Sequence, residues 1–414
     1  MRLNHVQAVL SERLQADAPA PLAVAFSGGG DSLALLLIAR DWARQHGRRL
    51  LVLSVDHRLQ PEGAAWVEAC AAMAERLGLP FHALAWTGPK PQGGLPAAAR
   101  AARHLLLAQA AREAGARVIL MGHTADDRLE AQVMRAAGAT TPDPRAWSPS
   151  PVWPEGRGLF LLRPLIDARR DELRDWLRAR GETWIEDPAN GDPRFARARA
   201  RAALTGAETP CAAPPPNAAP ALARACEATA WGGFAVAREA LRAADDAMAA
   251  RFLSAACLSA AGTSRPPRGE RLRRLLAATR DRDRVNATLA GARIEAQGET
   301  VRLWREPGET ARGGLAPRAL PAGEPIVWDG RYEILATRPG LAVRALVGLA
   351  ARLSEDERRA LGAVPAAARG ALPAVIEGGG VACPMLRAVE GVSLTPLAPD
   401  RLAAACGAVT REPG

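Results

Sequence analysis

The sequence is almost without lysine. Of its 54 lysine and arginine residues, only Lys90 is a lysine. The 6 cysteines are scattered and form no CxxC pair, which argues against a zinc or iron–sulfur site. No run of about 18 apolar residues occurs, so no membrane-spanning helix is expected. The opening stretch, MRLNHVQAVLSERL, is charged and amphipathic, unlike a signal peptide. These absences predict a cytoplasmic protein in a reducing compartment that has no contact with a membrane.

The positive charge of the chain is carried almost entirely by arginine, and the formal net charge is +10. The planar guanidinium group pairs well with phosphate, so the excess agrees with a nucleic-acid partner. A GC-rich genome that favours arginine codons explains the same composition. Net charge by itself therefore identifies no partner.

Strand and helix signals alternate through the first half of the 414 residues. This alternation predicts a parallel sheet with helices on both faces, and therefore an α/β fold. Ligands of such sheets bind beyond the carboxyl ends of the strands. The expected strands cover 21–26, 49–57, 80–86 and 116–123, and the expected helices cover 31–46, 61–77, 96–115, 125–135 and 169–181.

A proline-rich stretch, TPCAAPPPNAAP (209–220), is the best candidate for a linker. We expect an N-terminal domain over residues 1–210 and a C-terminal part over residues 220–414. Alanine-rich helical sequence is expected over 220–262, followed by a smaller α+β region over 263–414. Residues 138–158, which are rich in proline, glycine and tryptophan, predict a loop.

The stretch SGGGDS (27–32) lies between the first expected strand and its helix. A glycine-rich turn at this position exposes backbone N–H groups, and together with the helix dipole they bind anions, most often phosphate. A Walker A loop would require a lysine after its glycines, and the stretch SGGGDS has none. A dinucleotide fingerprint would require small residues where Asp31 stands, although Asp56 could serve as its acidic residue. A plain strand-to-helix turn is the alternative.

Acidic residues follow the fourth expected strand in the stretch MGHTADDRLE (121–130). Asp126 and Glu130 are four residues apart and share one helical face. Such groups could hold an ammonium ion or act as a base, but acidic residues also commonly cap helices. His123 could be a packed histidine, and Arg100 and Arg103 could lie on a solvated helix face.

Five stretches resemble one family. SGGGDS is similar to the SGGxDS loop of the PP-loop ATP pyrophosphatases. SVDHRLQPEG (54–63), RAARHLLL (100–107), MGHTADDRLEAQVMR (121–135) and residues 161–201 narrow the resemblance to the tRNA(Ile)-lysidine synthase family. The resemblance covers about residues 20–202. Gln60, His104 and Ala131 depart from it, because arginine, tyrosine and threonine are usual at these three positions.

The resemblance implies a reaction with ATP, Mg²⁺, free L-lysine and an isoleucine tRNA that has a CAU anticodon. Carbon 2 of the wobble cytidine is activated by transfer of AMP, and the amine of lysine then displaces AMP. The residues implied in ATP binding are Ser27, Gly28, Gly29, Gly30, Asp31, Ser32, Asp56 and His57, with Asp31 as a ligand of Mg²⁺. The residues implied in catalysis are Asp31, Arg100, Arg103, His123, Asp126, Asp127 and Glu130.

Contacts with tRNA or substrate are implied for Asp187, Asn190, Arg197, Arg199 and Arg201. In FARARARAA, solubilising charge is the alternative, and in EDPANGD the polar side chains could simply stabilise turns. By analogy with the family, the C-terminal part would dock tRNA, and its arginine-rich stretch 265–284 agrees with that role as well as with a solvated helix. A noncatalytic nucleotide-binding or RNA-binding protein would not need Asp31 and the acidic segment. A tRNA thiolase would usually require paired cysteines. The sequence leaves open whether the chain forms a homodimer.

Overall fold

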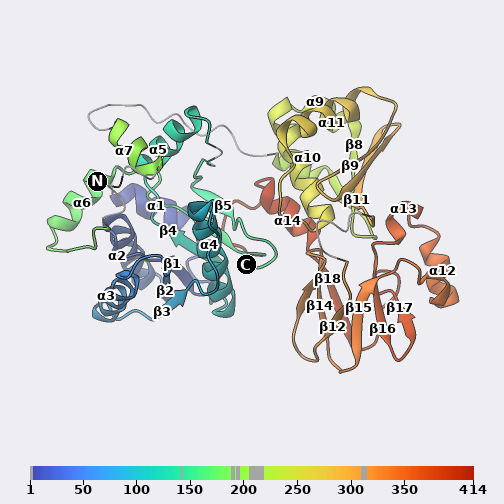
Figure 1. Ribbon diagram of the computed structural model, residues 1–414, viewed down its shortest axis with the longest axis horizontal. Coiled ribbons are helices and arrows are strands. Elements are labelled where there is room, and N and C mark those ends of the chain that lie inside the picture. Colours follow the sequence, from blue (N-terminus) through green and yellow to red (C-terminus); the bar gives the residue numbers. More distant parts are fainter. Residues whose placement is uncertain are drawn as a thin grey trace. The chain divides into compact units, whose positions relative to one another are not determined.

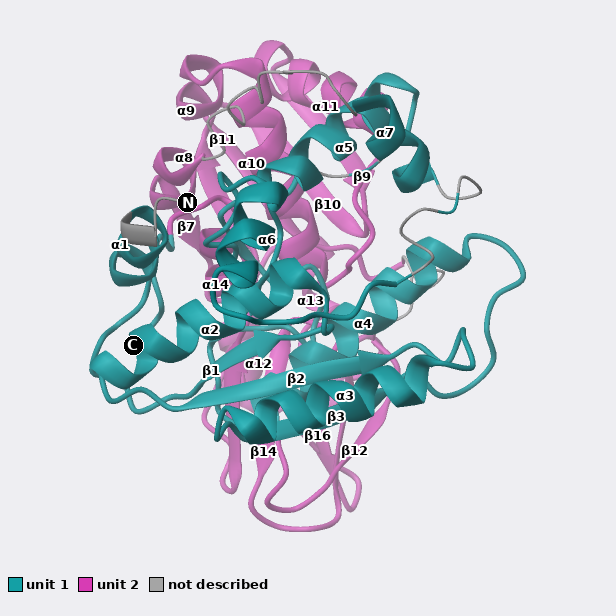
Figure 2. Ribbon diagram, turned by 90° about the vertical axis from the view of Figure 1, so that its left-hand side faces the viewer, with its two compact units in different colours: residues 1–216, 409–414 teal, residues 217–408 magenta. Residues whose placement is uncertain are grey.

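The computed structural model describes residues 3–139, 141, 143–187, 192, 196–204, 219–308 and 315–414. It contains two compact units, which are coloured separately in Figure 2. Unit 1 comprises Met1–Pro216 and Val409–Gly414, and unit 2 comprises Asn217–Ala408. Most of the expected linker, 209–218, lies outside the described residues.

Unit 1 is built on a six-stranded sheet with the order β3-β2-β1-β4-β6-β5. Every neighbouring pair is parallel except β5 with β6. The expected parallel α/β domain is therefore confirmed. The strands are β1 (Leu22–Ala25), β2 (Leu50–Asp56), β3 (Phe81–Ala85), β4 (Val118–Met121), β5 (Trp147–Pro149) and β6 (Phe160–Leu162).

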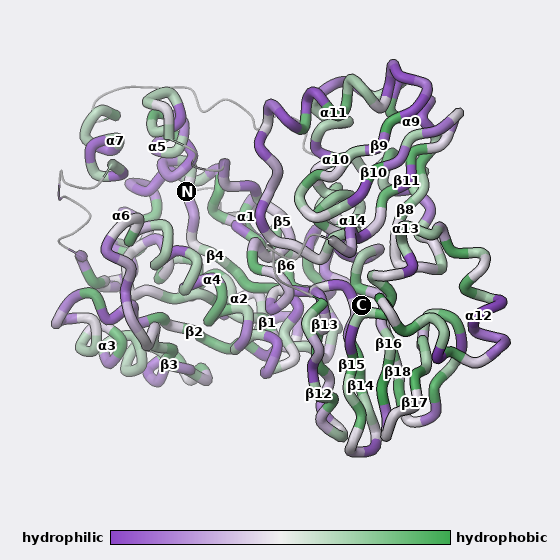
Figure 3. The backbone as a smooth tube through the Cα atoms, turned by 45° about the vertical axis from the view of Figure 1, so that its right-hand side comes forward, coloured by the Kyte–Doolittle hydropathy of each residue, from purple (hydrophilic) through white to green (hydrophobic). Residues whose placement is uncertain are grey.

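Alternate residues of the central strands face two separate cores, because side chains along a strand point to opposite faces. Leu22 and Val24 of β1 belong to the core that contains α2, whereas Ala23 between them belongs to the core that contains α4. Figure 3 shows the hydrophobic colour running through these strands and α2. The helices of unit 1 are α1 (Leu3–Arg13), α2 (Gly30–Gln45), α3 (Gly63–Arg76), α4 (Leu95–Glu113), α5 (Ala125–Ala136), α6 (Arg170–Arg178) and α7 (Ala196–Leu204).

The structure differs from the loop expected over 138–158, because β5 lies within it. This strand has three residues and ends in Pro149, and it pairs only with β6 at the edge of the sheet. Proline cannot donate a ladder hydrogen bond, so it is tolerated at an edge. A strand this short gives no periodic signal in the sequence.

The segment 409–414 returns to unit 1 and lies beside β5 (Figure 1). The Glu412 carboxylate accepts hydrogen bonds of 2.9 and 3.0 Å from the Arg48 guanidinium, and both side chains are buried. Arg48 also donates to the backbone oxygen of Ala20, and the Trp147 indole donates to that of Val409, each at 2.8 Å. A buried ion pair therefore fastens this segment to unit 1.

Unit 2 begins with α8 and a five-stranded antiparallel sheet with the order β7-β8-β11-β10-β9. The structure differs here from the helical sequence expected over 220–262, because β7 and β8 form a hairpin around Gly232 and Gly233. The elements are α8 (Pro220–Arg224), β7 (Cys226–Ala228), β8 (Phe234–Ala237), α9 (Arg238–Ala243), α10 (Asp246–Ala261), α11 (Gly269–Asp281), β9 (Arg284–Leu289), β10 (Ala292–Gln297) and β11 (Thr300–Arg305).

The remainder of unit 2 contains two further sheets, with the orders β12-β15-β16-β17 and β13-β14-β18. They enclose a shared core that includes Trp328, Tyr332 and Val343. Their elements are β12 (Arg318–Leu320), β13 (Ile326–Trp328), β14 (Tyr332–Ala336), β15 (Leu341–Ala345), η3 (Ala350–Arg352), α12 (Glu355–Leu361), α13 (Ala366–Arg369), β16 (Pro373–Glu377), β17 (Gly380–Ala382), β18 (Val392–Pro396) and α14 (Ala398–Ala405). The expected α+β character of this region agrees with these elements.

Candidate active site

The SGGGDS loop connects β1 to α2, as the sequence predicts. Gly28 has a φ of +78°, and a Cβ atom there would lie 2.4 Å from Cδ1 of Ile185. Only glycine fits such a position without strain. The Ser32 hydroxyl donates to the backbone oxygen of Gly29 at 2.8 Å and accepts from the N–H of Ser27 at 3.3 Å, which holds the turn closed.

Helix α2 begins at Gly30 without a side-chain cap. The first N–H groups of a helix have no partner within the helix, and the dipole adds partial positive charge there. The loop therefore offers backbone donors to an anion. The aromatic ring of Trp184 packs against Gly30, and the Ile185 N–H donates to the backbone oxygen of Gly28 at 2.9 Å. Residues 184–185 therefore fix the position of the loop.

A cavity of about 570 Å³ opens at the carboxyl ends of β1, β2 and β4. The chain passes from β1 to β2 and β3 on one side of the sheet and continues with β4 on the other side of β1. A crevice at such a switch in strand order is the usual ligand site of an open parallel sheet. The predicted site residues that line it are Ser27, Gly29, Gly30, Asp31, Ser32, Asp56, His57, Arg103, His123, Asp127, Asp187, Arg197 and Arg201.

The other predicted site residues that the structure describes do not line this cavity. Gly28 shapes the loop from behind, and Glu130 and Asp126 join the charge network described below. Burial and the charge of Arg197 lower the pKa of Arg100, and Asp127 opposes this shift. Asn190 lies outside the described residues.

Arg170 connects the acidic residues of the site. Its guanidinium lies 3.0 Å from the Asp31 carboxylate, 3.1 Å from that of Glu130 and 3.6 Å from that of Asp127. Its backbone N–H donates to Asp126 at 2.8 Å. The α2 and α5 carboxylates thus converge on one arginine at the start of α6, so Arg170 joins the phosphate loop to the acidic segment.

Two arginines of α7 reach the same carboxylates. Arg197 lies 2.9 Å from Glu130 and 3.0 Å from Asp127, and Arg201 lies 2.9 Å from Glu130. Residues four apart share a helical face, which explains why this pair acts together. Glu130 is almost completely buried, and its carboxylate accepts from three arginines.

Asp127 acts as a helix cap and as a member of the charge network. One oxygen accepts from the Thr124 N–H at 2.8 Å and completes a capping box at the start of α5. The other oxygen faces Arg197 and Arg170. The two interpretations of this residue that the sequence left open are therefore compatible.

The electrostatic environment differs between the acidic and the basic groups of the site. Burial raises the pKa of Asp31, although Arg170 opposes the shift. Burial alone would lower the pKa of Arg170, but the carboxylates of Asp31, Asp127 and Glu130 raise it above its ordinary value. Arg170 therefore stays cationic, and it offsets part of the effect that burial has on Asp31.

Buried basic groups, Arg103 and His123 among them, also line the cavity. Burial and the neighbouring Arg100 lower the pKa of Arg103 to about 10. Burial, with Arg163 and other arginines, holds the pKa of His123 well below 6.5, so the ring is neutral at pH 7. His123 Nδ1 and Arg103 Nε have no hydrogen-bond partner among the described residues. Buried polar atoms usually have partners, so both atoms are available to a ligand.

Sequence reasoning missed Arg170 and the two residues that hold the loop, Trp184 and Ile185. One signal for Arg170 was present. Arg169 and Arg170 stand at the beginning of an expected helix, where the dipole disfavours positive charge, so a partner of opposite charge could have been inferred. Nothing local in the sequence indicates that Ile185 packs against Gly28.

Known proteins share the sequence of this chain over most of its length. The family model described as the PP-loop domain matches residues 3–208. A protein of Caulobacter vibrioides named tRNA(Ile)-lysidine synthase is 49% identical, with 100% of this chain and 99% of the relative covered. Proteins of the same name from Hyphomonas neptunium and Ruegeria pomeroyi are 38% and 35% identical and cover 74% and 80% of this chain, and 88% and 80% of their own lengths. Identity over this length shows that the chain belongs to the tRNA(Ile)-lysidine synthase family.

Proposed function

We propose that this chain joins free L-lysine to carbon 2 of the wobble cytidine in the CAU anticodon of an isoleucine tRNA. The C2 oxygen attacks the α-phosphate of ATP and releases pyrophosphate, and the lysine amine then attacks C2 and releases AMP. The modified anticodon would read AUA instead of AUG, and the tRNA would accept isoleucine instead of methionine. One observation carries the proposal: an anion-binding loop and a cluster of carboxylates meet at one cavity.

The SGGGDS loop is the proposed site of the ATP phosphates. Its backbone donors face the cavity, and Asp31 stands at the first turn of α2. Mg²⁺ is usually held by one or two carboxylates together with substrate phosphates. Among the described residues, no group of three or more His, Cys, Asp or Glu side chains could hold a metal ion. Asp31 therefore fits an ion shared with ATP: its carboxylate would hold the ion, which would neutralise charge on the pyrophosphate.

The carboxylates of α5 are the proposed site for the lysine substrate. Asp127 and Glu130 already hold cationic side chains at 2.9–3.6 Å, the range of a charge-assisted contact. The ammonium group of lysine has the same charge and needs the same acceptors. Asp126 holds the start of α6 through the Arg170 N–H and so positions Arg170.

The basic side of the cavity is the proposed site of the activated nucleotide. Arg100 and Arg103 can stabilise negative charge that develops on the C2 oxygen and on the α-phosphate. Neutral His123, whose Nδ1 has no partner among the described residues, can hydrogen-bond to the nucleotide. Asp187 lines the cavity, and we assign to it and to Asn190 a supporting role at the substrate.

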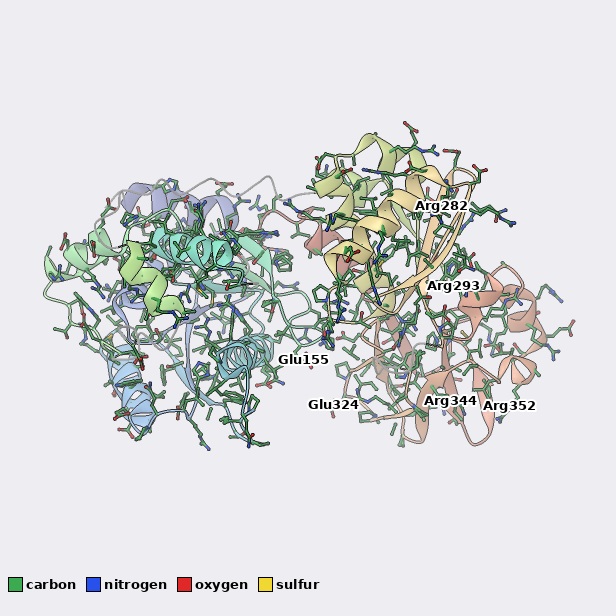
Figure 4. The ribbon with its side chains drawn as sticks, turned by 45° about the horizontal axis from the view of Figure 1, so that its top comes forward. Glu155, Arg282, Arg293, Glu324, Arg344 and Arg352 are labelled. Carbon is green, nitrogen blue, oxygen red and sulfur yellow. The ribbon has the colours of Figure 1, made fainter. Side chains whose placement is uncertain are left out.

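Unit 2 is the proposed docking part for the body of the tRNA. Figure 4 labels four arginines of this unit: Arg293 on β10, Arg344 on β15, Arg352 on η3, and Arg282, which directly follows α11. Side chains of this type supply the phosphate contacts that position a nucleic acid. Arg199 of α7 is the proposed phosphate contact of unit 1. Among the described residues, no helix is long and apolar enough to cross a membrane, and we assign the enzyme to the cytoplasm with its substrate.

The proposal is tested by incubating the full chain with ATP, Mg²⁺, radiolabelled lysine and a transcript of the CAU-anticodon isoleucine tRNA. We expect label in the tRNA and one AMP for each lysine incorporated. A transcript with an altered wobble base is the matched control and should stay unlabelled. Incorporation of sulfur from cysteine and a sulfur donor would instead support a thiolase, and ATP binding without AMP release would indicate a binding protein.

A further inference from the structure

The ends of β2 and β3 carry a basic cluster at the mouth of the cavity that none of the assigned roles uses. Asp56 of β2 pairs with Ala85 of β3, and the Trp86 N–H donates to the backbone oxygen of Asp56 at 2.8 Å. The residues that follow the two strands therefore lie next to each other. They are Arg58 in one loop and Lys90 in the other.

Lys90 is held in place by Trp86. Its ammonium nitrogen lies 3.6 Å from the centre of the indole ring and donates to the Trp86 backbone oxygen at 2.6 Å. A cation over an aromatic face keeps its charge while its flexible stem is ordered. The Trp86 ring also meets His57 edge to face, with 6.4 Å between the ring centres, and His57 lines the cavity. The one lysine of the chain is thus fixed beside the cavity mouth.

Arg58 lines the cavity and has a φ of +52°, in the left-handed region that residues other than glycine seldom adopt. The conformation is maintained by its backbone N–H, which donates to Asp56 at 2.7 Å. Strained backbone of this kind is often found at ligand sites. The side chain itself is exposed.

The two cations repel each other without a direct counter-ion. Within the described part of the chain, neither Arg58 nor Lys90 has a carboxylate within ion-pair distance. Asp56 is the acidic group that faces them. Its carboxylate accepts a hydrogen bond from the Arg58 N–H, and its charge acts on Lys90 without forming an ion pair with it. Burial and the charge of Arg58 lower the pKa of Lys90. Two cations that are kept close together and lack a paired carboxylate favour an anion between them.

We propose that Arg58 and Lys90 bind a phosphodiester group of the tRNA strand next to the reacting nucleotide. This inference rests on the proposed function, because it concerns the entry of RNA to the same cavity. Binding of this phosphodiester group would fix the RNA strand at the mouth of the cavity, while the base of the reacting nucleotide reaches the interior of the cavity. Lysine and arginine contacts to phosphate position RNA without reading its sequence.

The test compares Arg58→Gln, Lys90→Gln and the double variant of the full chain with wild type. We expect the KM for tRNA to rise roughly three- to tenfold for each single variant, with kcat and the KM for ATP unchanged within about twofold. The plot of log affinity against log salt should become shallower by about 0.7 for each contact removed. Lys90→Arg should restore most of the affinity.

The matched control is Arg117→Gln, since Arg117 is exposed in the same unit but precedes β4, at the amino ends of the strands, whereas the cavity lies at their carboxyl ends. It should leave both KM values unchanged. If the KM for ATP rises instead of that for tRNA, the cluster serves the nucleotide and the proposal is wrong. An unchanged KM for tRNA and an unchanged salt slope would also overturn it. Wild-type lysine incorporation in the same series reports separately on the proposed function.

Discussion

At the scale of single residues, the surroundings of Asp31 disfavour the charged form of its carboxyl group. It is a carboxylate that burial makes harder to ionise, and it is compensated by one arginine. A buried ion pair of this kind contributes little to stability, because the cost of removing both charges from water roughly cancels their attraction. Its position next to the phosphate loop is best explained by function.

Asp31→Asn should therefore keep the fold and lose ATP-dependent turnover by at least about 100-fold, because a neutral amide is a poor ligand for Mg²⁺. Release of pyrophosphate with tRNA and ATP present measures the effect. Asp41→Asn, on the exposed side of the same helix, is the control and should retain wild-type turnover. A folded Asp31→Asn enzyme with a near-normal rate would exclude the metal role.

Asp127 and Thr124 allow the cap to be separated from the chemistry. Both Asp127→Ala and Thr124→Ala break the capping box, so each should lower the free energy of unfolding by about 1 kcal/mol. Only Asp127→Ala also removes the carboxylate that faces Arg170 and Arg197, and it should abolish lysidine formation. Rapid-quench detection of adenylated tRNA then shows which step is lost. Equal activity of the two variants would mean that Asp127 is only a cap.

His104 should make unit 1 sensitive to acid. Burial, reinforced by Arg103, lowers its pKa from 6.5 to about 3. Between these values the unfolded chain binds a proton and the folded chain does not, so stability falls as the pH drops through this window. His104→Gln should flatten the dependence, measured by urea unfolding between about pH 5 and pH 7. His82→Gln, on the exposed side of β3, should leave it as in wild type.

At the scale of elements, the phosphate loop depends on a contact from far along the chain. Gly28→Ala adds a methyl group that meets Ile185, and it also forces an alanine into positive φ. We expect ATP affinity to fall at least about tenfold, because the loop must shift to relieve the clash. Gly47→Ala is the matched control, since Gly47 has a φ of +64° and open space around it. Equal ATP affinity of the two variants, measured by calorimetry, would contradict this account.

The elements around the site could be predicted because their signals are local. Apolar runs of four to seven residues predict β1, β2 and β4, and the glycine turn with Asp31 predicts the phosphate loop. β5 and β7 could not be predicted, because strands of three residues carry no periodicity, and β8 lies within alanine-rich sequence that predicts a helix. The pairing of Arg170 with Asp31 joins residues 139 positions apart. Only tertiary packing determines such a contact.

At the scale of the whole molecule, the ion pair between Glu412 and Arg48 should contribute substantially to the stability of unit 1. Glu412→Gln leaves a buried guanidinium without its counter-charge, which typically costs about 3–5 kcal/mol. Urea unfolding followed by a probe in unit 1 measures the loss. Glu377→Gln breaks an exposed pair with Arg338 and should cost much less stability, because solvent screens such a pair. Similar losses for both variants would show that the segment 409–414 is only loosely attached.

The return of residues 409–414 to unit 1 also affects how the chain matures on the ribosome. Unit 2 is inserted between the two parts of unit 1, so every one of its residues is synthesised before Glu412 emerges. Until then, Arg48 lacks its partner, and the nucleotide-binding unit is incomplete even though its whole sheet has been translated. Domains commonly fold in order during synthesis. Here the first unit to begin folding is the last to be completed, and a chain whose translation stops within unit 2 never completes it.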